Sequence, residues 1–491
     1  MKRVLSSGIS IKWFAVLSCL ALLLLLLPML KAAQYDVPSA DDYSNGLPTY
    51  KAWVRTGSVG AVLKAAWDRV YDLFFSWQGT FSAIFLFTLN PMIFGEQFYQ
   101  IGPWLIIFTL LAGNFYLVYT VYGRVFGASG AESCTVSAVW SILCTQFLPR
   151  VSQGIYWYTG AVYYTFFYGL AAVAYAVLLR FLVRKKGDRG IGKLITAGLL
   201  LFWIGGGNLV TGLTTAVVLV SLLAFAFWRK RADWKLLLIP LLCYAISFGL
   251  NVAAPGNMER QVFFAQPGVF RSVFLSFYEV GRSFIKWFTL PVWALILALV
   301  PVLLMVAVKT KIRFELPVLV TLYALCLSAV MFYAPIYAMT EQSLDHLGRI
   351  TNIIFFNMLF LVIFVLFYWI GWLVQKKKLS ESSFPLVEKR RCSIVFLVLM
   401  ALVFGLGMTG IKWYDTTSIS AFRSYRSMEM GNYWHTYKLR LEILKDPEVK
   451  DAVLKRFPYR PYVLFYQELS EDPSLNTPVA VWYNKDTVIA E

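Results

Sequence analysis

Residues 13–30 read WFAVLSCLALLLLLLPML, an apolar run that contains no charged residue and lies between Lys12 and Lys31. Its length suits a helix that crosses the hydrocarbon core of a bilayer. A secretory signal peptide is the competing interpretation, because the chain starts with basic residues. However, the apolar core is long, and Leu30-Lys31-Ala32 does not fit the small-x-small pattern of a cleavage site. We therefore expect this segment to be a first, retained transmembrane helix.

Similar apolar segments recur along the chain. Of its 491 residues, 59% are hydrophobic and 15% are charged, whereas a soluble protein is about half apolar and a quarter charged. The mean hydropathy is +0.63. The further spans that we predict lie near 103–122, 134–149, 158–182, 194–207, 209–228, 236–252, 288–308, 315–335, 353–375 and 392–411. The sequence therefore predicts an all-α polytopic membrane protein with about eleven transmembrane helices.

The basic residues indicate which side of the membrane each loop occupies. The net charge is +18, and Lys and Arg gather in short runs between alternate apolar segments, as in cytoplasmic loops. These runs lie at residues 2–12, 184–193, 229–235, 309–313 and 376–391. The pattern predicts a multi-pass protein of the cell membrane, with a cytoplasmic N-terminus and an extracytoplasmic C-terminal region. It argues against nucleic acid as a partner, because the positive charge belongs to membrane-flanking loops.

We divide the chain into a transmembrane domain, residues 1–411, and a small extracytoplasmic domain, residues 412–491, where hydrophobicity falls. The first outward loop, 31–102, is longer than a connector needs to be. Within it, apolar residues from Val59 to Phe74 recur at helical spacing, which predicts an amphipathic helix on the membrane surface.

The C-terminal domain contains signals for both kinds of secondary structure. Tyr433–Arg456 predicts a helix that is broken at Pro447. Tyr462–Gln467 and Val479–Tyr483 predict short strands, because each is a brief apolar and aromatic run. We expect a small α+β region on the outer side of the membrane.

Two adjacent carboxylates, Asp41 and Asp42, follow the first span closely. Such a pair can hold a divalent cation, Mg²⁺ or Mn²⁺, through hard oxygen ligands. Alternatively, one carboxylate can act as the general base toward a reacting hydroxyl. A solvated acidic turn is the third interpretation.

Polar and aromatic side chains gather in the loops that the predicted topology places outside. Aromatic rings can stack on the faces of sugars while amides and carboxylates bind their hydroxyl groups, so these residues are candidates for substrate binding. An aromatic belt at the membrane surface is the alternative interpretation. The candidates are Tyr43, Trp77, Gln78, Tyr156, Trp157, Tyr163, Asn208, Asn257, Glu341 and His346.

Several cations also lie on the outer side, where the positive-inside rule predicts few. Arginine suits phosphate because its planar fork matches two phosphate oxygens. The candidates for binding a lipid phosphate are Arg260, Arg271, Arg282 and Arg349, and in the loop 253–287 two of them share one helical face with Tyr278 and Lys286. The alternative is that each arginine extends to the headgroups of the outer leaflet.

The arrangement resembles the GT-C superfamily of membrane glycosyltransferases, and more narrowly a bacterial GT-C-like family. The segments that carry the resemblance are Asp41-Asp42-Tyr43, Trp77-Gln78-Gly79-Thr80, Trp157–Tyr163, Pro255-Gly256-Asn257 with Arg260, and Asn476 before Val479–Tyr483. Relatives have Trp-x-Gly-Arg in the second segment, whereas Thr80 stands here in place of the arginine.

This resemblance implies inverting transfer of a sugar from a polyprenyl-phosphate-linked donor to a cell-surface or lipid-linked glycan. Asp41 or Asp42 would be the catalytic base or a metal ligand, and Arg260 and Arg349 would stabilise the departing phosphate. A transporter or flippase of lipid-linked glycans is the main rival, but it predicts ionisable residues within the spans, which are nearly free of charge. A non-catalytic membrane scaffold is the third hypothesis.

Overall fold

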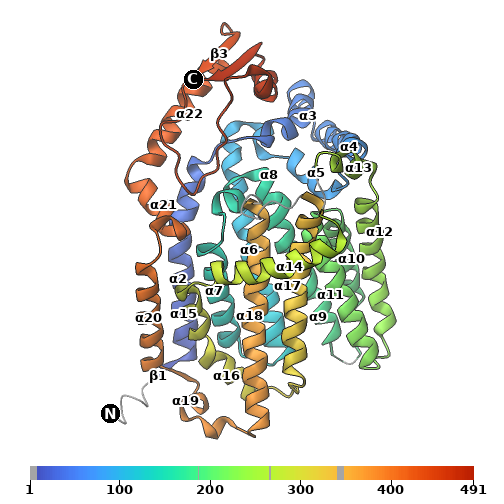
Figure 1. The fold of residues 1–491 in the computed structure, drawn as a ribbon, viewed down its shortest axis with the longest axis vertical. Helices are drawn as coiled ribbons and strands as arrows, with labels where there is room; N and C mark the ends of the chain where they lie inside the picture. The colour runs from blue at the N-terminus through green and yellow to red at the C-terminus, as the bar shows by residue number, and fades with distance from the viewer. Residues whose placement is uncertain (1–7, 186, 265–266, 340–347) are drawn as a thin grey trace.

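The computed structural model describes residues 8–185, 187–264, 267–339 and 348–491. Figure 1 shows a bundle of upright helices with the C-terminal segment above it. Eight helical segments of the described chain are long and apolar enough to cross a membrane, which supports a membrane-embedded protein. They are Ile11–Tyr35, Glu96–Val125, Tyr158–Leu182, Leu209–Trp228, Trp234–Val252, Leu290–Lys309, Pro317–Ala338 and Gly348–Lys376.

These eight segments coincide with eight of the predicted spans. The predicted spans 194–207 and 392–411 fall on two shorter apolar helices, α10 (Ile191–Gly205) and α20 (Ile394–Thr409). The predicted span 134–149 falls on α7 (Gly130–Gln146). This helix begins earlier than predicted because Ser129 and Glu132 form a capping box at its N-terminus. The number of eleven crossings stays a prediction.

The α-helices within the long segments have the following bounds. They are α2 (Ile11–Ala32), α6 (Ile101–Val118), α8 (Tyr158–Ala161), α9 (Phe167–Leu182), α11 (Leu209–Trp228), α12 (Leu238–Val252), α15 (Leu290–Ala298), α16 (Val300–Lys309), α17 (Pro317–Met339) and α18 (Gly348–Lys376). π-helical turns at Tyr119–Val125, Ser152–Tyr156 and Val162–Phe166 adjoin α6, α8 and α9.

The loops between the spans also contain helices. Residues 31–102 form α3 (Asp41–Thr56), α4 (Val59–Ser76) and α5 (Phe81–Thr88), and later connections form α13 (Pro255–Gln261), α14 (Val269–Trp287) and α19 (Pro385–Glu388). The helix predicted over Val59–Phe74 is present as α4, and its position on a membrane surface stays a prediction. Its buried side carries Val62, Ala66 and Val70, while Trp67 is exposed.

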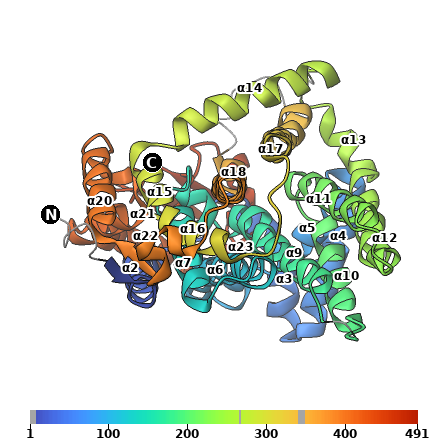
Figure 2. The same ribbon diagram turned by 90° about the horizontal axis from the view of Figure 1, so that it is seen from below.

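Helix α14 lies across the bundle instead of along it (Figure 1), and Figure 2 shows it at one edge, beside α17. Its inward side is a row of small and polar residues, including Ser272, Ser276 and Ser283, all buried. Its outward side presents bulky apolar groups, with Phe270 91% and Ile285 82% exposed. A helix with this distribution suits an environment of lipid, where the exposed apolar side is solvated by acyl chains.

Strand β1 (Gly8–Ser10) and the C-terminal residues lie at opposite ends of the bundle (Figure 1). Near the N-terminus, β1 (Gly8–Ser10) pairs antiparallel with β2 (Arg391–Ser393). At the same end, the carboxylate of Glu132 is fully buried and contacts Lys309 Nζ at 3.4 Å and Arg390 Nη2 at 3.2 Å. The N-terminal strand therefore shares an end with two of the basic runs, as the predicted topology requires.

The C-terminal residues fold differently from the prediction in three places. They form α21 (Thr417–Arg426), α22 (Glu429–Lys445), α23 (Thr477–Tyr483) and a parallel pair of strands, β3 (Asp451–Leu454) with β4 (Thr487–Ala490).

The predicted strand 479–483 is wrong, because these residues belong to α23. Pro478 lies in the first turn of this helix, a position where proline is favoured. The predicted strand 462–467 is also wrong. This segment is irregular, and the backbone N–H of Gln467 donates to Ser39 Oγ at 2.7 Å instead of to another strand. The predicted helix 433–456 ends at Lys445, before Pro447, and its last part forms β3.

Candidate functional site

Asp42 is fully buried at the start of α3, and both of its carboxylate oxygens accept hydrogen bonds. Oδ2 accepts from Ser39 N at 3.1 Å and Tyr99 OH at 2.7 Å, and Oδ1 accepts from Thr159 N at 3.1 Å and Thr159 Oγ1 at 2.6 Å. Burial raises the pKa of Asp42 to about 6, although these donors act to lower it. The carboxylate thereby holds α3 against α8.

Asp41, the neighbouring residue, is exposed. It lies at the edge of a cavity of about 200 Å³ between α3 and the C-terminal residues. Arg440 and Glu468 line the same cavity and form an ion pair of 2.8 Å. The acidic pair predicted from the sequence is thus divided between one buried and one accessible carboxylate.

This division does not fit a metal ion held jointly by Asp41 and Asp42. Both oxygens of Asp42 are already occupied by N–H and O–H donors. Among the residues that the structure describes, no three His, Cys, Asp or Glu side chains are grouped as metal ligands. We therefore derive no step that uses a metal.

A third aspartate, Asp36, lies in the same region and was missed at the sequence level. Its side chain is 1% exposed, and neither carboxylate oxygen has a hydrogen-bond partner within the described chain. Burial, together with the nearby charge of Asp42, raises its pKa well above the ordinary value. A single Asp between a span and a loop carries no sequence signal of burial, so the prediction had no basis for selecting it.

The segment Trp77-Gln78-Gly79-Thr80 packs against α13, so two motifs that are far apart in the sequence meet. Gly79 N donates to Asn257 Oδ1 at 3.0 Å, and Arg260 Nη1 donates to Gln78 Oε1 at 2.8 Å. The guanidinium of Arg260 also lies 5.5 Å from the ring centre of Trp77. The structure thus brings together Trp77, Gln78 and Asn257, which are candidates for substrate binding, and Arg260, a candidate for phosphate binding.

Beside this contact lies a cavity of about 540 Å³. Asn257, Arg260, Tyr163 and Tyr164 line one part of it. Aliphatic and aromatic side chains of α11, α12 and α17 line the remainder, among them Leu213, Phe248, Val252 and Ala334. The cavity thus combines an apolar wall with a polar end that carries a cation.

Arg349 lies close to that polar end. Its guanidinium is 4.6 Å from the ring centre of Trp157 and 5.8 Å from that of Tyr164. Its backbone N–H donates to Gln153 Oε1 at 3.0 Å. Since Tyr164 lines the cavity that Arg260 also lines, Tyr164 connects the two predicted phosphate-binding arginines. Tyr164 was not among the predicted site residues, although it directly follows Tyr163.

Other predicted residues are engaged in the fold. Tyr156 is fully buried, and its hydroxyl donates to Met29 O at 2.9 Å. Tyr43 is buried against Trp482 with ring centres 5.6 Å apart. Asn208 caps α11, because its Oδ1 accepts from Thr211 N at 2.8 Å.

The remaining predicted residues lie elsewhere. Arg271 and Arg282 belong to α14, and Arg282 lines a different cavity from Arg260. Glu341 and His346 fall outside the described residues.

In comparisons with known proteins, no protein family matches the chain, and no curated protein matches it. The resemblance to membrane glycosyltransferases therefore rests on the quoted motifs alone.

Proposed function

We propose that this protein is a membrane glycosyltransferase that transfers a sugar from a polyprenyl-phosphate-linked donor to a cell-surface or lipid-linked glycan at the outer face of the membrane. The cavity of about 540 Å³ carries the proposal, because its apolar wall and its arginine suit an amphiphile with an anionic phosphate. The isoprenoid chain would lie along α11, α12 and α17, and the phosphate would lie near Arg260.

The reaction is an inverting displacement. The acceptor oxygen forms a bond to the anomeric carbon while the bond from that carbon to the phosphate oxygen breaks. The acceptor proton passes to a carboxylate, and the lipid phosphate leaves with the bonding electrons. Arg260 and Arg349 flank Tyr164, so their charges favour the phosphate as its negative charge increases.

Asp41 is the member of the acidic pair that an acceptor can reach, because it is exposed and lines the cavity of about 200 Å³ between α3 and the C-terminal residues. We assign it the role of general base. Asp42 is a positioning residue in this scheme, because its oxygens are occupied by Ser39, Tyr99 and Thr159. A divalent cation stays a prediction of the sequence and has no role in this scheme.

The rival function, passage of lipid-linked glycans across the membrane, requires a polar path. A second cavity, of about 340 Å³, follows the first along α11 and α17. Its lining is mostly apolar, with Leu117, Trp140 and Phe360 among the residues. Such a lining suits a lipid chain better than a glycan, which favours the transferase over the flippase.

The proposal is tested by transfer of radiolabelled sugar from a panel of polyprenyl-phosphate donors to membrane glycans, with purified protein in lipid. Asp41→Asn should reduce transfer at least ten-fold without lowering the melting midpoint. Arg260→Gln should reduce transfer at least ten-fold and lower the melting midpoint slightly, because it also loses the hydrogen bond to Gln78. Lys64→Gln, which changes an exposed ion pair with Asp68 in the same loop, is the control. Full activity of Asp41→Asn would refute its role as base. Translocation of the lipid-linked glycan without transfer would favour the flippase.

A further inference from the structure

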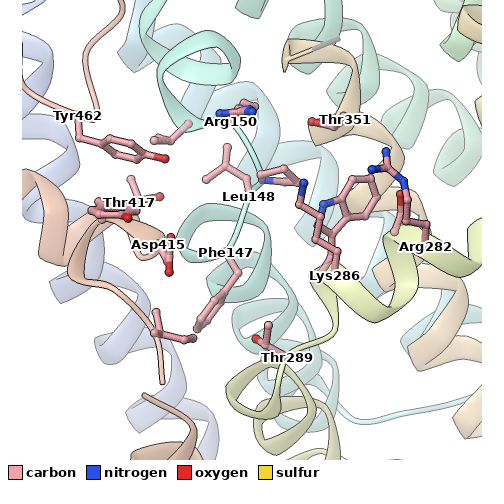
Figure 3. Close-up of a pocket in the computed structure, with 16 residues that line it drawn as sticks. Phe147, Leu148, Arg150, Arg282, Lys286, Thr289, Thr351, Asp415, Thr417 and Tyr462 are labelled. Carbon is pink, nitrogen blue, oxygen red and sulfur yellow. The ribbon is translucent and has the colours of Figure 1, made fainter. Parts of the chain in front are cut away.

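A separate cavity, of about 390 Å³, lies where several apolar helices end (Figure 3). Helix α7 ends at Gln146, α20 ends at Thr409, and α15 begins at Leu290, and residues next to each of these ends line the cavity. This position corresponds to the boundary between the apolar bundle and the polar C-terminal residues, where lipid headgroups are found.

The walls of the cavity differ in charge. Arg150, Arg282 and Lys286 carry positive charge, and Arg282 Nε also forms an ion pair of 2.8 Å with Glu279 Oε2. Figure 3 shows Arg282 and Lys286 on one side of the cavity, with Asp415 and Tyr462 on the other. Three cations around one cavity on the predicted outer side contrast with the scarcity of Lys and Arg that the positive-inside rule predicts there. Snorkelling of single side chains does not require them to converge.

The cavity also has an apolar part. Phe147, Leu148 and Ile411 line it, and all three lie at or just beyond the ends of apolar helices. A ligand that fills the cavity therefore meets hydrocarbon on one side, cations on another, and a carboxylate opposite them. The backbone N–H of Lys412, in the same turn, donates to Asp415 Oδ2 at 3.0 Å. Asp415 Oδ1 is then the oxygen that accepts from a ligand hydroxyl.

We infer that this cavity binds the headgroup of an anionic phospholipid that carries hydroxyl groups. The phosphate is bound by Arg150, Arg282 and Lys286, a headgroup hydroxyl donates to Asp415, and the start of the acyl chains packs on Phe147 and Leu148. The inference does not depend on the proposed glycosyl transfer, because Arg260 and Arg349 do not line this cavity.

The test measures binding of phosphatidylglycerol to the purified full-length protein by native mass spectrometry, with phosphatidylcholine as the neutral comparison. Wild type should retain phosphatidylglycerol preferentially. Arg150→Gln/Lys286→Gln should lower its affinity about ten- to hundred-fold, the loss expected for two charge-assisted contacts. The matched control, Lys51→Gln/Arg55→Gln, also removes one lysine and one arginine. Both are exposed and do not line the cavity, so this variant should bind as wild type does.

A second variant keeps the test decisive if the double variant unfolds. Arg150→Lys retains the charge but not the planar fork, and it should weaken phosphatidylglycerol binding by a smaller factor. Inorganic phosphate and pyrophosphate form the other arm of the experiment. If they compete with phosphatidylglycerol only at millimolar concentration, the lipid assignment stands. If they bind as tightly as the lipid, or if the double variant and the matched control bind equally, the assignment is overturned.

Discussion

Asp42 and Thr159 are joined by two hydrogen bonds that end on the same carboxylate oxygen. The Thr159 backbone N–H and hydroxyl group lie 3.1 Å and 2.6 Å from Asp42 Oδ1. Since Asp42 lies in the first turn of α3 and Thr159 lies in α8, this contact fixes the segment 31–102 to the helical bundle. Trp157, which lies beside Arg349, belongs to the same short stretch as Thr159.

Asp42→Asn should therefore destabilise the protein. The asparagine amide has only one acceptor oxygen, and its NH₂ group would face the N–H and O–H donors that now bind the carboxylate. We therefore expect a loss on the order of 3 kcal/mol in the free energy of unfolding. The melting midpoint of the purified protein in nanodiscs measures the effect. Asp41→Asn is the matched control, because Asp41 is exposed, and it should melt as wild type does. Equal midpoints for the two variants would contradict the positioning role of Asp42.

Asp36 should make stability depend on pH in an unusual direction. Its pKa is raised in the folded state, so the folded protein binds this proton more tightly than the unfolded chain does. The stabilisation from Asp36 is thus complete below its ordinary pKa of 3.8 and decreases as the pH rises toward the higher folded pKa. Asp36→Asn should therefore raise the melting midpoint relative to wild type, with a gain that grows from pH 4 to pH 8. A constant difference across that range would contradict this account.

Gly79 should tolerate no side chain. A Cβ atom there would overlap the carbonyl oxygen of Asn251 and lie 2.5 Å from the Cβ of Ala254. Gly79→Ala should separate the Trp77–Thr80 segment from α13, with a loss of about 2 kcal/mol or more and reduced donor binding. Gly60→Ala, in the same outward loop, is the control because its nearest neighbour is Ser58 Oγ at 3.6 Å. Thermal unfolding of both variants, with donor retention measured in parallel, checks the prediction.

Glu132 should be the most sensitive carboxylate at the end of the bundle that carries β1. It is fully buried, accepts from Ser129 N at 2.7 Å and faces Lys309 and Arg390. Glu132→Gln should lower the free energy of unfolding by about 1–3 kcal/mol, because Arg390 and Lys309 lose a buried carboxylate and Lys309 keeps only the longer contact of 3.8 Å to Glu381. Asp68→Asn changes the exposed ion pair with Lys64 and should have little effect. Comparable losses for the two variants would show that burial of Glu132 is unimportant.

The sequence was sufficient for features that the membrane itself dictates. Long apolar segments such as 13–30 and 353–375 predict helices because a bilayer leaves few alternatives for the backbone. The contact between Trp77–Thr80 and Pro255–Arg260 could not be derived from the sequence alone, because it joins segments that lie far apart in the chain. The short runs 462–467 and 479–483 could not be assigned reliably, because four to six apolar residues suit a strand or a buried helix equally.

The candidate site was only partly predictable, because burial depends on packing between distant segments. Asp41 and Asp42 are adjacent and chemically identical, yet only Asp42 meets Tyr99 and Thr159. Helix α14 shows the same limitation. Its helical periodicity was recognised from Arg271 and Arg282, but its serines, not its aromatic residues, face the protein.

The pairing of residues 8–10 with residues 391–393 has a consequence for biogenesis. The first of these strands is synthesised before the eight long apolar helices that follow it, whereas its partner is synthesised after all eight of them. Helix α2 is therefore in the translocon or the bilayer before the β1–β2 pair can form, while the intervening helices insert. Pairing of β1 with β2 is a late event, because it requires contact between segments that are far apart in the sequence. Truncation before Arg391 removes the partner of β1. Helix α2 should still insert, but residues Gly8–Ser10 should become accessible to proteases.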